Sequence, residues 1–230
     1  MKLLASDYDN TLKCNILDLK INIYYLKKFI EDGNIFLLNT GRPYNSIIKE
    51  INKYKIPYHY LSCNDGNILF DSNNNILYLS SLDNIIYEEL KKLKKIYKIA
   101  INTIKYLENV LEYEIIISKL DKLFLLKLDK IMIKYNMCYK VFNEGEIHIY
   151  IYHKDISKSK SIELVSNLEN ISKNNIYTIG DNINDLEMLR DYNGYAIASA
   201  KEEIKEIAGN SITSVSCLIR KLRSLTIKSQ

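Results

Sequence analysis

The sequence predicts an α/β protein in which a Rossmann-like open parallel sheet forms the core and an α+β domain is inserted into it. Short apolar runs alternate with helical patterns over residues 1–63, and this alternation resumes at residue 157. Strands that alternate with helices indicate parallel strands joined by right-handed crossovers. Between these parts, strand patterns come in pairs. We therefore expect a core domain of residues 1–79 and 154–230 and an inserted αββαββ domain of residues 80–153.

The first part of the core reads as strand, helix, strand, helix, strand. The apolar run after Met1 is typical of a buried strand, and the first helical pattern ends at Gly33, a common helix stop. A hairpin should follow, because two strand patterns flank an Asn-rich turn at residues 71–75. These elements are expected at residues 2–6, 20–32, 35–38, 47–53, 58–63, 67–70 and 76–79.

The rest of the chain is interpreted from the same periodicities. The inserted domain should contain two helices, each followed by two strands. In chain order these are expected at residues 82–97, 99–104, 112–118, 119–135, 138–142 and 146–152. The core should then continue with helices at residues 160–168, 186–190, 201–208 and 217–225 and strands at residues 175–179, 195–198 and 211–215.

The composition is ordinary for a globular protein, with 47% hydrophobic and 26% charged residues. No apolar run approaches the roughly 20 residues of a membrane span. The first residues carry no signal-peptide pattern, so we expect a cytoplasmic protein without a membrane partner. The net charge is only +4 and acidic residues lie between the lysines, which argues against a nucleic-acid partner. The oligomeric state has no signature in the sequence.

Two aspartates, Asp7 and Asp9, follow the first predicted strand. Both carboxylates should leave the end of that strand on the same side. Two carboxylates held this close need a cation, and they also offer a nucleophile and a proton donor for moving a phosphoryl group. The alternative is an Asx-rich turn that only closes the strand. Thr40, Asn64 and Asp181 also follow predicted strands, and ligands of open α/β sheets bind at the carboxyl ends of the strands.

Four short motifs now stand in order along the chain: DYDNT from Asp7, NTGR from Asn39, SKSKS from Ser157 and GDNIND from Gly180. Together they resemble the four motifs of the haloacid dehalogenase superfamily, and in detail those of the Cof-type phosphatases with a type II cap. The resemblance extends to CNDG at residues 63–66, to the inserted domain as the cap, and to the tail GYAIASAKEEIKEIA. Each of these motifs lies at the end of a predicted strand or helix, which is the structural context that such motifs require.

The resemblance implies a reaction through an aspartyl phosphate. Asp7 would be the nucleophile, and Asp9 would protonate the leaving group and then activate water. Asp7, the backbone carbonyl of Asp9 and Asp181 would bind Mg²⁺, with Asp185 and Asn184 orienting the metal-bound waters. The alternative for GDNIND is a helix N-cap, and for Asp185 both interpretations can hold together.

Thr40 and Lys160 would hold the oxygens of the transferring phosphoryl group, the first through its hydroxyl and the second through its charge. Lys158 competes with Lys160, because SKSKS offers two lysines two residues apart. We prefer Lys160, because the apolar residues after it fit the helix that follows the family lysine at this offset.

Gly41, Arg42 and Asn64 complete the expected substrate-binding set. Arg42 either binds substrate or braces its loop, and Asn64 either lies near the substrate entrance or forms an Asx turn. The sequence departs from the family pattern at Asp65, where a small residue is usual, and at Ser161, where many members have glycine. Neither residue is expected to contact the groups that carry out the proposed chemistry.

We therefore expect a Mg²⁺-dependent phosphatase that hydrolyses a small phosphorylated metabolite, such as a sugar phosphate or a similar phosphomonoester. The cap is expected to exclude water and select the leaving group. Within enzymes, the alternative is a phosphomutase or phosphotransferase of the phosphomannomutase type. The alternative of another class is a regulator that binds a phosphometabolite without catalysis.

Overall fold

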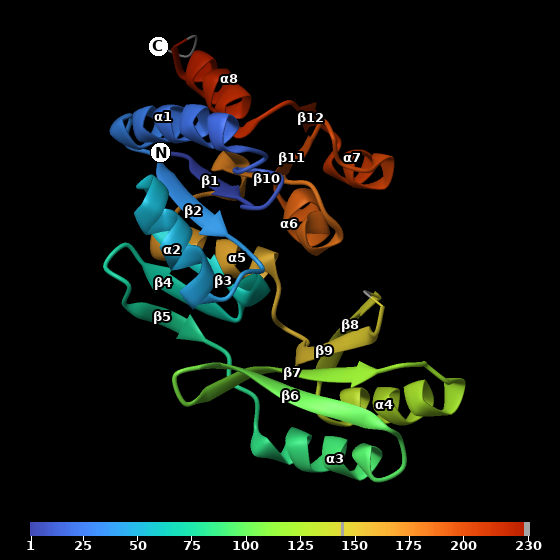
Figure 1. Cartoon of the computed structure of the whole chain (residues 1–230). Helices are drawn as coiled ribbons and strands as arrows, with labels where there is room; N and C mark the ends of the chain where they lie inside the picture. Colours follow the sequence, from blue (N-terminus) through green and yellow to red (C-terminus); the bar gives the residue numbers. More distant parts are fainter. Residues whose placement is uncertain (144, 228–230) are drawn as a thin grey trace. The chain divides into compact units, whose positions relative to one another are not determined.

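The computed structural model describes residues 1–143 and 145–227, and it forms two compact units (Figure 1). One unit comprises Met1–Leu79 with Ser157–Gln230, and the other comprises Ser80–Ile156. The sequence placed the second boundary between these units three residues earlier, at residues 153 and 154. The two units are described separately below.

The first unit is built on an eight-stranded sheet with the order β12-β11-β10-β1-β2-β3-β4-β5. The strands from β12 to β3 are parallel, whereas β4 and β5 add an antiparallel edge. The predicted open α/β sheet is therefore confirmed. The strands are β1 (Leu3–Ser6), β2 (Ile35–Asn39), β3 (Tyr60–Cys63), β4 (Ile68–Asp71), β5 (Ile76–Leu79), β10 (Ile176–Gly180), β11 (Asn193–Ile197) and β12 (Ser211–Ile212).

The central strands are buried along their whole length. Every residue of β1, with the sequence LLAS, and of β2, with the sequence IFLLN, is buried, as expected for parallel strands covered on both faces. The covering helices are α1 (Ile16–Glu31), α2 (Tyr44–Tyr54), α5 (Lys158–Leu168), α6 (Leu186–Asp191), α7 (Glu202–Ala208) and α8 (Val215–Ile227). Helices α1 and α8 pack together, although they come from opposite ends of the chain (Figure 1).

Some element ends differ from the prediction. Helix α1 begins at Ile16 and not at residue 20, because the side chain of Asn15 accepts a hydrogen bond from the backbone N–H of Asp18 and caps the helix. The last strand, expected to reach residue 215, is only two residues long, and α8 already starts at Val215.

The inserted unit is a four-stranded antiparallel sheet with the order β6-β7-β9-β8. Alternate residues of β7, such as Tyr113 and Ile115, are buried against Leu90 of α3 and Phe124 of α4. This arrangement confirms the predicted αββαββ order. The elements are α3 (Asn84–Lys94), β6 (Ile99–Tyr106), β7 (Asn109–Ile117), α4 (Lys122–Lys134), β8 (Met137–Asn143) and β9 (Ile147–His153).

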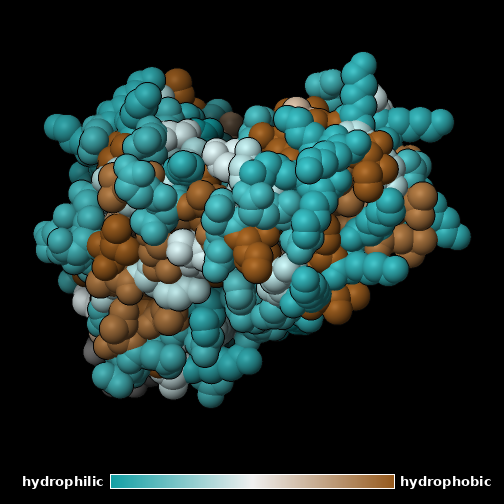
Figure 2. All heavy atoms as spheres, turned by 90° about the horizontal axis from the view of Figure 1, so that it is seen from below, coloured by the Kyte–Doolittle hydropathy of each residue, from teal (hydrophilic) through white to brown (hydrophobic). Residues whose placement is uncertain are grey.

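The surface mixes polar and apolar side chains. Figure 2 shows hydrophilic groups interspersed with smaller hydrophobic ones over the face in view. Among the described residues, none of the helices combines the length and the apolar character needed to cross a membrane.

His59 links the backbone of β2 to the segment before β3. Its Nδ1 accepts a hydrogen bond from the backbone N–H of Phe36 at 3.2 Å, and its own backbone N–H donates to the carbonyl of Phe36 at 3.0 Å. Burial lowers the pKa of His59, while the charge of Glu169 opposes this effect. A protonated Nδ1 could not accept the bond, so the fold favours the neutral imidazole.

We expect the His59→Gln variant to lose part of the pH dependence of stability. Because the pKa of His59 is lower in the folded chain than in the unfolded chain, its stabilising contribution is present above about pH 6.5 and is lost as the pH falls below that value. Glutamine keeps an acceptor and does not titrate. Urea unfolding at about pH 7.5 and about pH 5.5 should show a smaller loss for the variant than for the wild type. Equal losses would contradict this role for His59.

Candidate active site

Three neighbouring strands bring the predicted acidic and hydroxyl residues together. Strand β1 lies between β10 and β2, and all three are parallel. Asp7 directly follows β1, Thr40 follows β2 and Asp181 follows β10. The carboxyl ends of parallel strands share one edge of the sheet. The fold therefore places these three residues at the same edge.

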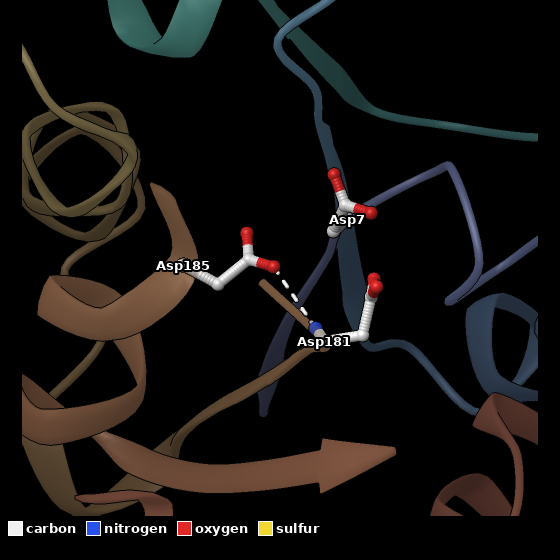
Figure 3. A group of neighbouring side chains, drawn as sticks. All are labelled: Asp7, Asp181 and Asp185. Carbon is white, nitrogen blue, oxygen red and sulfur yellow. Dashed lines mark hydrogen bonds between the residues drawn. The ribbon is translucent and has the colours of Figure 1, made fainter. Parts of the chain in front are cut away.

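The carboxylates of Asp7, Asp181 and Asp185 form a cluster at this edge. One oxygen of each lies within 4.8 Å of the other two, and Figure 3 shows the three side chains converging. Burial raises the pKa of Asp7 to about 7; Lys158 opposes this shift, while Asp185 and Asp181 add to it. Burial also raises the pKa of Asp181. Ionising all three carboxyl groups of the cluster therefore costs free energy unless further positive charge lies nearby.

Asp185 organises the loop between β10 and α6. Its Oδ2 accepts a hydrogen bond from the backbone N–H of Asp181 at 2.9 Å (Figure 3) and another from the backbone N–H of Asn182 at 3.1 Å. The chain passes very close to this carboxylate, since a Cβ on Gly180 would lie 2.5 Å from the Cγ of Asp185. Asp185 thus completes a capping box in which Asn182 is the N-cap residue, and its carboxylate also belongs to the acidic cluster.

Lys158, and not Lys160, lies at the carboxylates. The side chain of Lys158 is fully buried, and its Nζ donates to Oδ1 of Asp7 at 2.6 Å and to Oδ1 of Asp185 at 2.7 Å. Burial alone would lower the pKa of Lys158, but the charges of Asp185 and Asp7 raise it overall, so the side chain is an ammonium. Lys160 instead donates to Glu163 at 2.8 Å on the partly exposed side of α5.

The start of α5 explains why the preference for Lys160 misplaced the site lysine. Ser157 caps the helix, so Lys158 is its first residue. Residues two positions apart point about 200° apart around a helix axis, so only one of the two lysines can face Asp7. The fit of the apolar residues after the motif did not determine which lysine faces inward.

Arg42 contacts Asp9 in a bidentate ion pair. Its Nε lies 2.7 Å from Oδ2 and its Nη2 2.6 Å from Oδ1 of Asp9. The guanidinium also lies over the ring of Tyr8, 5.1 Å from its centroid, and the Tyr8 hydroxyl donates to Glu50 at 2.6 Å. Of the two alternatives for Arg42, this geometry favours bracing, and the group that it braces is the Asp9 carboxylate.

The loop after β2 and the turn after β3 hold the remaining predicted substrate-binding residues. Thr40 is buried, and its Oγ1 accepts a hydrogen bond from the backbone N–H of Arg42 at 3.1 Å. Asn64 is also buried, and its backbone N–H donates to the carbonyl of Arg42 at 3.1 Å. Gly41 lies beside Asp65, whose Oδ1 would be 3.0 Å from a Cβ at that position.

Two contacts near the cluster were not predicted. Asp65 was expected to stay away from the chemistry, yet its Oδ1 accepts a hydrogen bond from Nδ2 of Asn184 at 2.9 Å. Thr11 donates from Oγ1 to Oδ1 of Asp181 at 2.7 Å. Asp65 thereby contacts a residue of the predicted metal site. The only signals in the sequence were that Asp65 departs from the family pattern and that Thr11 belongs to DYDNT.

The donor set fits a hard divalent cation. Three carboxylates face one ammonium, that of Lys158, within the cluster. Burial raises the pKa values of Asp7 and Asp181 and neighbouring carboxylates add to the shift, so a cation at the cluster would favour the ionised forms. Carboxylate and carbonyl oxygens are the ligands that suit Mg²⁺. The residues present therefore match the predicted metal.

Comparison with known families gives a match along most of the chain. A family model described as haloacid dehalogenase-like hydrolase matches residues 4–115 and 102–216. A Buchnera aphidicola (subspecies Baizongia pistaciae) protein named "Putative phosphatase" is 25% identical over an alignment 265 positions long, which covers 96% of this chain and 97% of that protein.

Solved structures with the same fold cover nearly the whole chain. A phosphatase of the haloalkanoate (HAD) enzyme superfamily from Bacteroides thetaiotaomicron has a TM-score of 0.78 at 17% identity, covering 99% of this chain and 96% of that one. A subclass IIB sugar phosphatase has a TM-score of 0.71 at 16% identity, covering 99% of this chain and 100% of that one. At these identities the similarity establishes the fold.

Replacing Lys158 should destabilise the chain far more than replacing Lys160. In Lys158→Met, the carboxylates of Asp7 and Asp185 stay buried without their ammonium partner, so we expect a loss of about 3–5 kcal/mol in the free energy of unfolding. Lys160→Met removes a partly exposed pair and should cost less than about 1 kcal/mol. Urea unfolding in the presence of a chelator measures both. Similar losses in the two variants would contradict this placement of the lysines.

Proposed function

The chain belongs to the haloacid dehalogenase-like hydrolases, and from this membership we propose that it is a Mg²⁺-dependent phosphatase of small phosphorylated metabolites. The observation that carries the proposal is the buried contact of Lys158 with Asp7 and Asp185, beside Asp181. A sugar phosphate or a similar phosphomonoester is the proposed substrate class. The related sugar phosphatase supports this choice.

In the proposed reaction Asp7 is the nucleophile. Its carboxylate oxygen attacks the phosphorus in line, a new O–P bond forms, and the bond from phosphorus to the leaving-group oxygen breaks. Asp9 gives its proton to the departing alkoxide. In the second step, Asp9 takes a proton from water as the water attacks the aspartyl phosphate, which releases inorganic phosphate and regenerates the Asp7 carboxylate. Arg42 orients Asp9 through its bidentate contact.

The transferring phosphoryl group needs positive charge and hydrogen-bond donors around its oxygens. Lys158 replaces Lys160 in this proposed role, because its ammonium already contacts an oxygen of the nucleophile, at 2.6 Å. The hydroxyl of Thr40 would donate a second bond. Preorganised groups of this kind stabilise the transition state of phosphoryl transfer.

A Mg²⁺ ion at the acidic cluster would neutralise the repulsion between the carboxylates and the phosphate. Asp7, the backbone carbonyl of Asp9 and Asp181 are its proposed ligands. The oxygens of Asp185 accept bonds from Lys158 and from two backbone N–H groups, so its proposed role is to orient Asp181 and the loop. Asn184, held by Asp65, would orient metal-bound water.

A screen of phosphorylated metabolites for release of inorganic phosphate tests the proposed function. With Mg²⁺ present, we expect the wild type to release phosphate from at least one phosphomonoester. Asp7→Asn should lower kcat by about 10³-fold or more, because an amide is no nucleophile for phosphorus. Asp32→Asn is the matched control, since Asp32 pairs with Arg223 away from the cluster.

Three outcomes would count against the proposal. Turnover that survives Asp7→Asn would exclude the covalent step. Transfer of the phosphoryl group to a second hydroxyl of a sugar, without release of phosphate, would identify a phosphomutase. Binding of phosphorylated metabolites without turnover across the screen would identify a regulator.

Mg²⁺ should also stabilise the protein independently of catalysis. A ligand that binds only the folded state raises Tm with its concentration. We expect Mg²⁺ to raise Tm of the wild type and of Asp32→Asn, and to have a much smaller effect on Asp181→Asn, which removes a proposed ligand. Thermal unfolding followed by circular dichroism, with and without a chelator, measures this. An equal rise in all three proteins would contradict the assignment of Asp181.

A further inference from the structure

Asn39 is the last residue of β2 and comes directly before Thr40. Its side chain is fully buried, and its Nδ2 donates to the backbone carbonyl of Lys158 at 2.8 Å. We propose that Asn39 is a positioning residue, which fixes the start of α5 so that the ammonium of Lys158 reaches Asp7. The proposal rests on the proposed function for its catalytic consequence, but the positioning itself can be tested separately.

The hydrogen bond joins the two parts of the site through rigid elements. Strand β2 pairs with β1 in register, with Leu38 opposite Ser6, so Asn39 is fixed relative to the strand that carries Asp7. Lys158 is the first residue of α5, and its carbonyl can accept a side-chain bond as well as a helical one. A bond to this carbonyl therefore holds the backbone from which the lysine side chain extends.

Neighbouring contacts hold other residues of the same turn. The hydroxyls of Ser62 and Ser161 lie 2.8 Å apart in the core. Gly66 packs tightly against Ser157, because a Cβ there would lie 2.3 Å from the Ser157 carbonyl oxygen. These contacts locate the helix, whereas Asn39 contacts Lys158 itself.

Asn39 differs from Asn22, another buried asparagine, in how its amide is bonded. Asn22 is also buried, but both ends of its amide are satisfied: Nδ2 donates to the Leu12 carbonyl at 2.9 Å, and Oδ1 accepts from the Ser216 N–H at 2.8 Å. In the described part of the chain, Oδ1 of Asn39 has no hydrogen-bond partner. A buried polar atom without a partner is costly. The contribution of the Asn39 amide therefore comes from the bond of its Nδ2 to the Lys158 carbonyl at 2.8 Å.

The variants for the test are Asn39→Leu and Asn39→Ala. Leucine has the shape of asparagine without its donor and without the unpaired oxygen, so Asn39→Leu should fold even if the smaller alanine leaves a damaging void. The matched control is Asn34→Ala at the opposite end of β2. There, Asn34 donates from Nδ2 to the Phe29 carbonyl at 3.1 Å and accepts from the Lys2 N–H at 2.9 Å.

The first readout does not depend on activity. A buried ammonium that is held by two carboxylates should give its own ¹⁵N–¹H signal, which can be assigned because it is absent from Lys158→Met. We expect this signal to shift or disappear in Asn39→Leu and to stay unchanged in Asn34→Ala. An unchanged signal in folded Asn39→Leu would overturn the proposal. A changed signal would support it even if no phosphatase activity were found.

The second readout is kinetic. We expect Asn39→Leu to lower kcat for phosphate release by about 10- to 100-fold, as for other small misplacements of a reacting group. When Asn39→Leu is added to Lys158→Met, it should change kcat by less than about 2-fold, since the two residues act through one contact. If the fold-losses in kcat of the two single variants multiply in the double variant, the proposal is overturned, because Asn39 then acts independently of Lys158.

Discussion

The buried ammonium of Lys158 between Asp7 and Asp185 is the contact on which the candidate active site depends. Removing charges from water costs several kcal/mol for each ion, so such a group persists only where its partners are held in place. The partners come from the end of β1 and from the loop after β10, while the lysine comes from the first turn of α5. The strand order, in which β1 lies beside β10, allows Asp7 and Asp185 to contact the same ammonium.

Two aspartates only two residues apart have very different surroundings. The side chain of Asp7 is 9% exposed and contacts the ammonium of Lys158, whereas the side chain of Asp9 is 48% exposed and is held by the guanidinium of Arg42. Different surroundings are how neighbouring carboxylates acquire different chemical roles. In the proposed reaction Asp7 attacks phosphorus and Asp9 transfers protons.

The sequence was sufficient for the fold and for the edge of the sheet where the site lies, because both follow from local periodicity. The alternation of strands and helices implies parallel strands, and their carboxyl ends then bring Asp7 and Asp181 together. The orientation of Lys158 could not be read in this way, since it depends on the residue at which α5 begins. The contacts of Asp65 with Asn184 and of Asn39 with Lys158 each span 119 residues, and such pairings have no local signature.

The insertion of Ser80–Ile156 between the two parts of the core has a consequence for how the protein folds. Asp7 and Lys158 are separated by 151 residues, so the chain must close a very long loop before they meet. The inserted unit is continuous in sequence and makes its contacts over shorter separations, which favours faster folding. During synthesis it can therefore form while β1 still lacks its neighbour β10. The carboxylates of the site then stay hydrated until the last third of the chain has been synthesised. The free-energy cost of burying them therefore arises only when their partner, Lys158, is present.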